Sequence, residues 1–406
     1  MMTHPATVGL DGPFFTDPDE LYQKLRRESP VVRVTTPIGL NAWMVTRYED
    51  VRPALNDPRL SKSAARFAEM LERRSIPPDR RIQLADSVAG HMLNTDPPDH
   101  TRLRKLVNRA FTVRAVARMR PRIEEIANRL ADTMAAKGAG GATVDLIDEF
   151  AFPLPMTVIC ELLGVPDGER DDFRAWSNTL LSFSPQQERI AAAGAMRDFL
   201  TRLVIGKGAN PGDDMLSAIV QASEDGDSLS PGEAISMAFL LLVAGHETTV
   251  NLIGNGVLAL LRHPDQLAAL RADPSLIPNA VEEFLRFDGP VNLATLRYTT
   301  EPVELGGIMI PAGEVVLVSL VSANRDPERY REPTELDVTR DASGHVAFGY
   351  GIHHCLGAPL ARLEGEIAFR TLIERFPDLA LAEEPQRLVW RQSMLIHGLT
   401  RLPVHL

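Results

Sequence analysis

Residues 348–357 read Phe-Gly-Tyr-Gly-Ile-His-His-Cys-Leu-Gly, and this stretch says more about the chain than any other. Its glycines permit backbone conformations and close approaches that other residues resist, so the loop can lie against a flat ligand. A helix is expected to begin near Pro359, and the amide groups at a helix start favour an anion such as a thiolate. The segment therefore predicts a loop that presents Cys355 as a metal-bound sulfur.

The chain holds two cysteines, Cys160 and Cys355, which form no disulfide framework and fit a reducing compartment. A free cysteine is most often a small buried hydrophobe. That interpretation suits Cys160, which lies in an apolar run at helical spacing. It does not suit Cys355, because three glycines, Phe348 and His353 surround it at fixed spacing.

The cysteine loop resembles the haem-binding loop of the cytochrome P450 superfamily, whose signature Phe-Gly-x-Gly-x-His-x-Cys-x-Gly is filled at every fixed position. The resemblance extends over nearly the whole chain. It implies a mainly α fold with a minor β portion, in which haem b lies between a long central helix and the cysteine loop. It also implies that Cys355 is the axial ligand of the iron and that Phe348, Gly349 and Gly357 help to bind the cofactor.

Two other motifs begin in the sequence but are not completed. Gly349-Tyr350-Gly351 opens like a dinucleotide fingerprint, but His354 stands where the last glycine is needed. His246-Glu247 opens like a zinc-protease motif, but Val250 stands where the second histidine is needed. We exclude both.

A long helix is expected from Pro231 to about Arg262. Ser230-Pro231-Gly232-Glu233 combines a capping serine, a proline at the first helical position and a capping-box glutamate. Midway, Ala244-Gly245-His246-Glu247-Thr248 matches the oxygen-activating segment of the family, with Ala244 next to the cofactor. The resemblance implies that Thr248 and Glu247 are catalytic. Taken alone, the segment fits a polar spot on a partly exposed helix equally well.

Further site residues are implied by the resemblance alone. Cationic or hydrogen-bonding groups for the haem propionates are expected at His100, Arg104, Arg297 and His353. Apolar side chains are expected over the distal haem face, where they would bind substrate, at Leu93, Leu240, Val243, Leu293, Ala294 and Leu395.

Glu283 and Arg286 lie three residues apart, so a helix places them on one side. Most such pairs are exposed and of little consequence. In the family this pair is structural and anchors the loop before the cysteine, usually with a third basic residue. Glu335 stands here where an arginine is often found, and we leave Arg325 and Arg340 open as substitutes.

Periodicity predicts helices over about 17–28, 48–56, 100–134, 147–163, 187–204, 231–262 and 278–287 and from Pro359, strands over 31–35 and 42–45, and a hairpin-like tail over 388–404. Because no linker, repeat or low-complexity segment interrupts the chain, we expect a single catalytic domain over 1–406. Residues 1–15 show no secretory signal, and Ala238–Gly245 is too short for a membrane span, so a cytoplasmic location is expected.

The net charge of −11 disfavours nucleic acid as a partner, because phosphate binding needs a dense basic face. The segment 101–120 is nevertheless basic and carries no acidic residue. We expect its face with Arg102, Lys105 and Arg109 to dock an acidic ferredoxin on the proximal side.

The resemblance implies a monooxygenase that inserts one oxygen atom from O₂ into a hydrophobic small molecule, by hydroxylation or epoxidation. A macrolide, terpenoid, steroid or fatty acyl compound would fit. The sequence carries no flavin or iron–sulfur module, so electrons are expected from a ferredoxin and an NAD(P)H-dependent reductase. A peroxide-using haem enzyme and a non-catalytic haem-binding sensor are the alternatives.

Overall fold

The computed structural model of the chain describes residues 7–406 except 38, 74–89, 109–110, 182–183 and 225–226. Arg109 of the expected docking face and the first six residues of the segment expected to lack a secretory signal lie outside the described residues.

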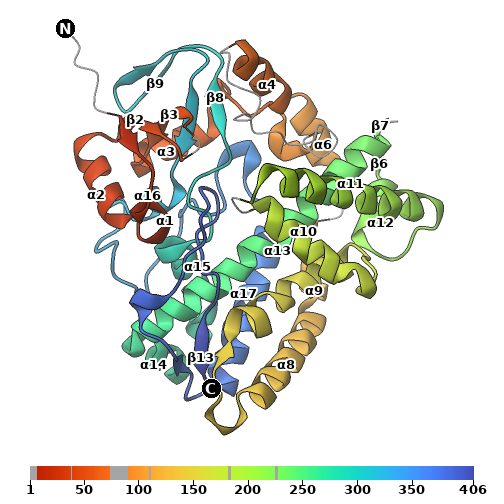
Figure 1. Cartoon of the computed structure of the whole chain (residues 1–406), viewed down its shortest axis with the longest axis vertical. Coiled ribbons are helices and arrows are strands. Elements are labelled where there is room, and N and C mark those ends of the chain that lie inside the picture. Colours follow the sequence, from red (N-terminus) through yellow and green to blue (C-terminus); the bar gives the residue numbers. More distant parts are fainter. Residues whose placement is uncertain (1–6, 38, 74–89, 109–110, 182–183, 225–226) are drawn as a thin grey trace.

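One end of the molecule is built on a six-stranded sheet with the order β1-β2-β3-β11-β8-β4 (Figure 1). Its pairs are antiparallel except β1–β2 and β3–β11. The expected strands are confirmed as β2 and β3. The members of the sheet are β1 (Val8–Gly9), β2 (Val31–Thr35), β3 (Asn41–Val45), β4 (Leu60–Ser61), β8 (Arg297–Thr299) and β11 (Val315–Val318).

Short helices accompany this sheet, and a separate two-stranded hairpin shares an apolar cluster with it. The expected helices over 17–28 and 48–56 are confirmed as α2 and α3. These elements are α1 (Pro13–Thr16), α2 (Asp19–Glu28), α3 (Tyr48–Asn56), α4 (Ala64–Arg73), α16 (Leu320–Asn324), β9 (Val303–Leu305) and β10 (Ile308–Ile310).

The other end of the molecule is helical, with α13 (Pro231–Arg262) running through its middle (Figure 1). The predicted start of α13 is confirmed, because the Ser230 side chain accepts from the Glu233 amide and the Glu233 side chain accepts from the Ser230 amide. This helix is long and apolar enough in composition to cross a membrane, but 78% of its most apolar window is buried in the structure.

Helices that precede α13 in the sequence and helices that follow it make up the rest of the helical part. The expected helix over 100–134 is divided into α6, α7 and α8, and the one over 147–163 begins with a π-helical turn, η4. These elements are η2 (Met92–Asn94), α6 (Asp99–Asn108), α7 (Val113–Arg118), α8 (Arg120–Lys137), η3 (Ala139–Gly141), η4 (Ile147–Ala151), α9 (Pro153–Leu162), η5 (Asp167–Glu169), α10 (Arg170–Leu181), α11 (Gln186–Ala209), α12 (Met215–Val220), α14 (Pro264–Ala272), η6 (Pro274–Leu276), α15 (Ile277–Asp288) and α17 (Ala358–Arg375).

The tail forms a hairpin-like turn, as expected, held by a bridge between Trp390 and Leu399 and by the Arg391 amide bonding to the Gly398 carbonyl at 2.8 Å. The remaining short elements are β5 (Val144–Asp145), β6 (Ser223–Glu224), β7 (Asp227–Ser228), η7 (Gly351–His353), β12 (Ala380–Leu381), η8 (Pro385–Arg387) and β13 (Pro403–His405).

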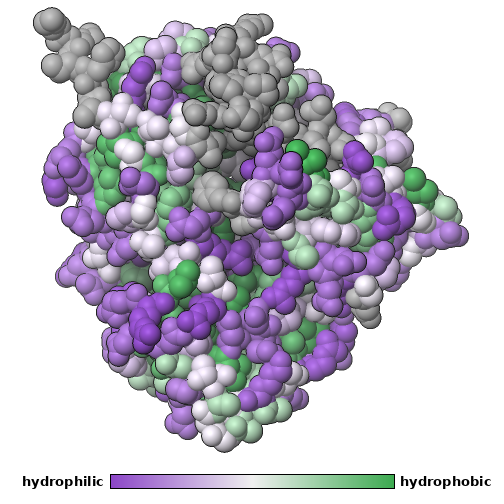
Figure 2. Space-filling view, in the orientation of Figure 1, coloured by the Kyte–Doolittle hydropathy of each residue, from purple (hydrophilic) through white to green (hydrophobic). Residues whose placement is uncertain are grey.

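The largest buried apolar cluster lies in the helical part around α13, and two smaller clusters pack on the sheet. The face of the molecule in Figure 2 is mostly hydrophilic, with hydrophobic patches that are small and separate. The apolar side chains are therefore used mainly for the interior, where they position α13 and the loop before α17.

Candidate active site

The cysteine loop has a backbone that its glycines make possible. Gly349 and Gly351 adopt φ values of +71° and +76°, which L side chains rarely take. A Cβ on Gly351 would lie 2.1 Å from Asn56 Oδ1 of α3, so this position has no room for a side chain. The Cys355 amide donates to the Phe348 carbonyl at 2.8 Å and closes the loop.

Side chains of α15 and α17 support the residues at the start of the cysteine loop. Glu282 of α15 accepts from Arg362 of α17 at 2.6 and 2.9 Å and lies 3.0 Å from His345 Nε2. Burial alone would raise the pKa of Glu282, but these hydrogen bonds outweigh it and lower the pKa to about 2. The Arg362 guanidinium lies 4.6 Å from the centre of the Phe348 ring. Phe348 is thus fixed at the start of the loop.

Cys355 is accessible although protein surrounds it, whereas Cys160 is fully buried and contacts Met156, as expected for a core residue. Burial raises the pKa of the Cys355 thiol, while the Gly357 and Ala358 amides and the Arg104 charge oppose that rise. The loop therefore supplies groups that stabilise a thiolate once a metal takes its charge.

The middle of α13 is open on one side. Ala244 is exposed and Thr248 partly exposed, although most of the helix around them is buried, and residues four apart share a helix face. The Thr248 hydroxyl donates to the Ala244 carbonyl at 3.0 Å. Thr249 is only 2% exposed. The open face is therefore the one with Ala244 and Thr248.

Glu247 lies away from that open face and is 1% exposed. Its Oε1 is 2.6 Å from Arg391 Nη1 of the tail, an ion pair without the alignment of a hydrogen bond. Its Oε2 is 3.5 Å from His246 Nε2, which also lies 3.2 Å from Ser177 Oγ of α10. The two residues expected to be catalytic thus differ in position: Thr248 lies on the open face of α13, whereas Glu247 is buried.

The four residues expected at the propionates do come together. The rings of His100 and His353 lie 4.3 Å apart, and Arg104 Nη2 donates to the His354 carbonyl at 2.7 Å. Burial, followed by neighbouring cations that include Arg297 and Arg104, lowers the pKa of His353 to about 2. Both ring nitrogens of His100 are buried, and neither has a hydrogen-bond partner among the residues that the structure describes. The group is cationic and incompletely paired.

The expected substrate residues fall into two groups. Leu93 and Val243 pack against the large cluster that contains Leu240. In the second group the Asn292 amide donates to the Leu395 carbonyl at 2.9 Å, which sets Leu395 beside the segment of Leu293 and Ala294. Leu293 is 2% exposed and packs with the sheet, whereas Ala294 and Leu395 remain partly accessible.

Three comparisons with known proteins extend this picture. Residues 183–396 match the family model described as Cytochrome P450. The chain is 55% identical over 400 residues to Cytochrome P450 107B1 of Saccharopolyspora erythraea, with 98% of each chain covered. It belongs to the cytochrome P450 family.

Other members of the cytochrome P450 family agree. The chain is 52% identical to the vitamin D(3) 25-hydroxylase of Pseudonocardia autotrophica, covering 97% of this chain and 95% of that one. The solved structure of the tirandamycin C-bound monooxygenase TamI superposes with a TM-score of 0.90 at 48% identity, covering 98% and 100%. The expected fold is confirmed, and the chain is a monooxygenase of the bacterial type that acts on small organic molecules.

Membership in the cytochrome P450 family implies a haem-thiolate cofactor, and the residues present fit one. Cys355 offers an accessible sulfur on a loop that bends at two glycines of positive φ. Arg297 is only 3% exposed, and its hydrogen bonds go to the Thr295 and Leu55 carbonyls at 3.1 and 3.5 Å. A buried guanidinium that forms no ion pair with a carboxylate among the described residues suits a propionate.

The expected Glu283–Arg286 pair forms what we call the anchor cluster, Glu283, Arg286 and Arg340. Arg286 donates to Glu283 at 2.6 and 2.7 Å, and Arg340 Nε lies 3.2 Å from Glu283 Oε1. Arg340 is therefore the third basic residue that the sequence left open. Arg325 is engaged elsewhere, 3.6 Å from Asp19 and 3.7 Å from Asp288.

Sequence reasoning did not single out Lys62, Asp96 or Arg391. Lys62 follows a two-residue strand, which has no periodicity to detect, and it is 6% exposed. Arg391 lies in the tail, far along the chain from Glu247. We find no signal in the sequence that separates these residues from other charged ones.

Ion pairs within the protein reduce the positive charge that the expected docking face offers to a partner. Arg102 pairs with Asp227 and Glu233, so its charge is met within the protein. Arg114 and Arg118 of α7 are exposed and have no ion pair within the described part of the chain. Among the described arginines of segment 101–120, the exposed ones without an ion pair therefore lie on α7.

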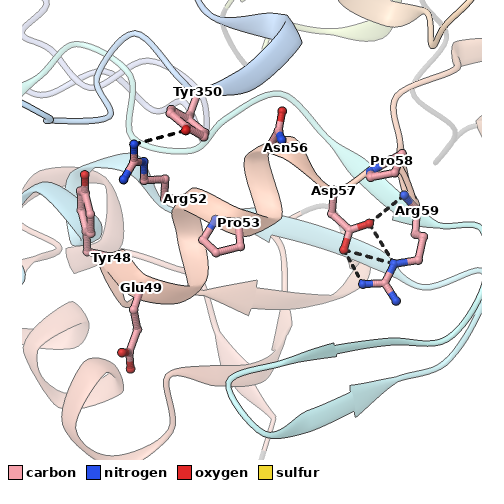
Figure 3. A pocket seen from close by; sticks show the side chains of 9 residues that line it. All are labelled: Tyr48, Glu49, Arg52, Pro53, Asn56, Asp57, Pro58, Arg59 and Tyr350. Carbon is pink, nitrogen blue, oxygen red and sulfur yellow. Dashed lines mark hydrogen bonds and ion pairs between the residues drawn. The ribbon is translucent and has the colours of Figure 1, made fainter.

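A surface groove of about 700 Å³ lies between α3 and Tyr350 of the cysteine loop (Figure 3). Arg52 lies 4.4 Å from the centre of the Tyr350 ring and 3.2 Å from its hydroxyl, and Asp57 pairs with Arg59 at 2.6 Å. The groove is open, and neither Cys355 nor α13 lines it. It is not the active site.

Proposed function

We propose that the protein binds haem b with the Cys355 thiolate as axial ligand and inserts one oxygen atom from O₂ into a hydrophobic small molecule. When bound, this cofactor supplies activation of O₂ with two electrons and two protons, and the second oxygen atom leaves as water. The Cys355 thiolate would hold the iron and donate electron density to it, which is the chemistry that favours O–O cleavage. The observation that carries the proposal is an accessible cysteine on a glycine loop beside a buried, incompletely paired group of cations.

Thr248 is the residue of this chain that would move a proton at the open face of α13. Its hydroxyl lies one turn from Ala244, on a face otherwise lined by apolar groups such as Val243. An alcohol in this place can hold a water molecule and pass on a proton. Glu247 would assist proton supply from the neighbouring face of α13. Its ion pair with Arg391 holds the carboxylate on that face.

The substrate class rests on the apolar residues near α13 and the tail and on the relatives. Relatives at 52% and 45% identity are a vitamin D(3) 25-hydroxylase and a 6-deoxyerythronolide B hydroxylase. The names of these relatives give small organic molecules as their substrates. A hydrophobic molecule of this kind, a macrolide, terpenoid, steroid or fatty acyl compound, fits Leu93, Leu240, Val243, Ala294 and Leu395.

Electrons would come from a ferredoxin served by an NAD(P)H-dependent reductase. The support is the free positive charge of Arg114 and Arg118 on a protein whose net charge is −11. α7 contacts α17, the helix that follows the cysteine loop. A basic patch here steers an acidic partner toward the cysteine side.

A cytoplasmic location and a single catalytic domain over 1–406 are part of the same proposal. The single domain is supported by a relative that aligns over nearly its full length. It is also supported by the contact between α3, which accompanies the sheet, and Gly351 of the cysteine loop.

The test is the carbon monoxide complex of the reduced protein. We expect the red-shifted Soret band of thiolate ligation, and we expect Cys355→His to abolish it while Cys160→Ser retains it. An unchanged band in Cys355→His would overturn the assignment. Activity with hydrogen peroxide alone, without any electron donor, would favour a peroxide-using enzyme instead.

A further inference from the structure

Lys62 lies among the buried cations near the cysteine loop. It follows β4, which pairs antiparallel with β8 through Leu60–Thr299 and Ser61–Tyr298. Lys62 is the residue after β4, so continuing this register by one residue would set it opposite Arg297, whose charge acts on it. We call Lys62, Arg104 and Arg297 the cation cluster.

The two opposed cations are both buried, with Lys62 6% and Arg297 3% exposed. Like charges directly opposite each other on neighbouring strands destabilise a sheet. Burial, reinforced by Arg297, lowers the pKa of Lys62 far below its usual range, and burial lowers that of Arg297 to about 10. The two side chains therefore lie in a place that the protein itself makes unfavourable for their charges.

Only one carboxylate acts on these two side chains within the described residues. Asp96 accepts from the Lys62 amide at 2.9 Å and from the Ser61 hydroxyl, and its charge favours the charged forms of Lys62 and Arg297. No hydrogen bond or ion pair of the Lys62 ammonium is found in the described part of the chain.

The charges can be counted. With Lys62 protonated, three cations face the single carboxylate of Asp96, which leaves two positive charges unmatched. Lys62 and Arg297 are buried, and a buried charge without a partner is costly. A haem brings two carboxylates on its propionates, while its ferric iron meets the charge of the Cys355 thiolate. The two unmatched positive charges of the protein therefore equal in number the two negative charges of the propionates.

We propose that Lys62 is a direct ligand of the haem propionates, opposite Arg297 and in addition to His100, Arg104 and His353. The proposal rests on haem binding as proposed above. Its ammonium group then donates a charge-assisted hydrogen bond where the protein offers none. The same residue as a neutral amine packed in the interior, or as a cation that binds an acidic substrate, would make no difference to how tightly haem is held.

The test measures haem release from the purified holoenzyme to excess apomyoglobin. We compare Lys62→Met, which keeps the length but removes the charge, with Lys62→Arg and with Lys24→Met, whose lysine is exposed on α2. We expect release from Lys62→Met to be about tenfold faster or more, since a buried charge-assisted hydrogen bond is lost. Lys62→Arg should stay within about threefold of wild type and Lys24→Met should match it.

A second readout is the ferric–ferrous midpoint potential. Loss of a positive charge near haem disfavours the reduced, more negative state, so the potential of Lys62→Met should fall. Both variants should keep the thiolate band of the carbon monoxide complex, which separates this proposal from that of Cys355 ligation.

Wild-type haem release and an unchanged potential in Lys62→Met would overturn the proposal, and faster substrate dissociation with unchanged haem release would assign Lys62 to substrate instead. Should Lys62→Met accumulate without haem, Lys62→Gln and Lys62→Arg decide. Faster release from the glutamine than from the arginine variant supports the proposal, and equal rates overturn it.

Discussion

The anchor cluster and the cation cluster each contain two buried charged residues, and they differ in how those charges are met. In the anchor cluster, Arg286 bonds to Glu283 and also to the Asn324 and Pro333 carbonyls at 3.1 and 2.8 Å. In the cation cluster, Arg297 bonds only to carbonyls, and the Lys62 ammonium has no bond within the described residues. Charges matched by the protein hold the fold, whereas unmatched ones indicate a ligand.

Breaking the anchor cluster should have the largest effect. Arg286→Met leaves Glu283 buried with Arg340 as its remaining cation, and removing one partner of a buried pair costs about 3–5 kcal/mol. We expect urea unfolding of the haem-loaded protein to show this loss. Arg27→Met, at a site 71% exposed, should change stability by less than about 0.5 kcal/mol. Equal unfolding midpoints for both variants would contradict the contrast between matched and unmatched charges.

Turning a matched charge into an unmatched one should have a smaller effect. Arg391→Met removes the cation closest to Glu247, and we expect a loss of about 2 kcal/mol in the free energy of unfolding. The double variant Glu247→Gln/Arg391→Met should recover part of that loss, because no buried charge is then left alone. Additive losses in the double-mutant cycle would show that the ion pair does not matter.

The Thr248 hydroxyl carries no charge. Its replacement tests whether catalysis depends on the open face of α13 rather than on the buried charges. Thr248→Ala should keep haem content, substrate binding and first-electron reduction. NAD(P)H consumption should continue but yield mostly hydrogen peroxide, with product per NAD(P)H reduced about tenfold or more. Thr249→Ala, at a buried position about 100° away around the helix, is the matched control. Wild-type coupling in Thr248→Ala would mean that protons arrive by another route.

Unmatched charges at the surface complete the comparison, since solvent makes them inexpensive and available to a partner. The variant Arg114→Glu/Arg118→Glu should slow reduction by ferredoxin several-fold at low salt and leave substrate binding unchanged. Arg102→Gln should matter less, because Asp227 and Glu233 already engage that side chain. Reduction rates that ignore both the substitutions and the ionic strength would leave α7 an ordinary solvated surface.

The sequence predicted best what local chemistry dictates. The capping box at Ser230 located the start of α13, and the glycine pattern located the cysteine loop. Arg340 stayed open because its contact with Glu283 depends on the path of the loop between α16 and the cysteine. Lys62 and Arg391 were missed because their environments are assembled from distant strands and from the tail. Burial and charge balance are properties of the folded chain.

The contact between Gly351 and Asn56 has a consequence for protein engineering. A single missing Cβ lets α3, near the start of the chain, lie directly beneath the loop that carries Cys355. In a chimera with a relative, a crossover between the two segments would combine an α3 and a loop that have not been fitted to each other. Residues 48–56 and 348–357 therefore form one recombination block, although most of the chain separates them.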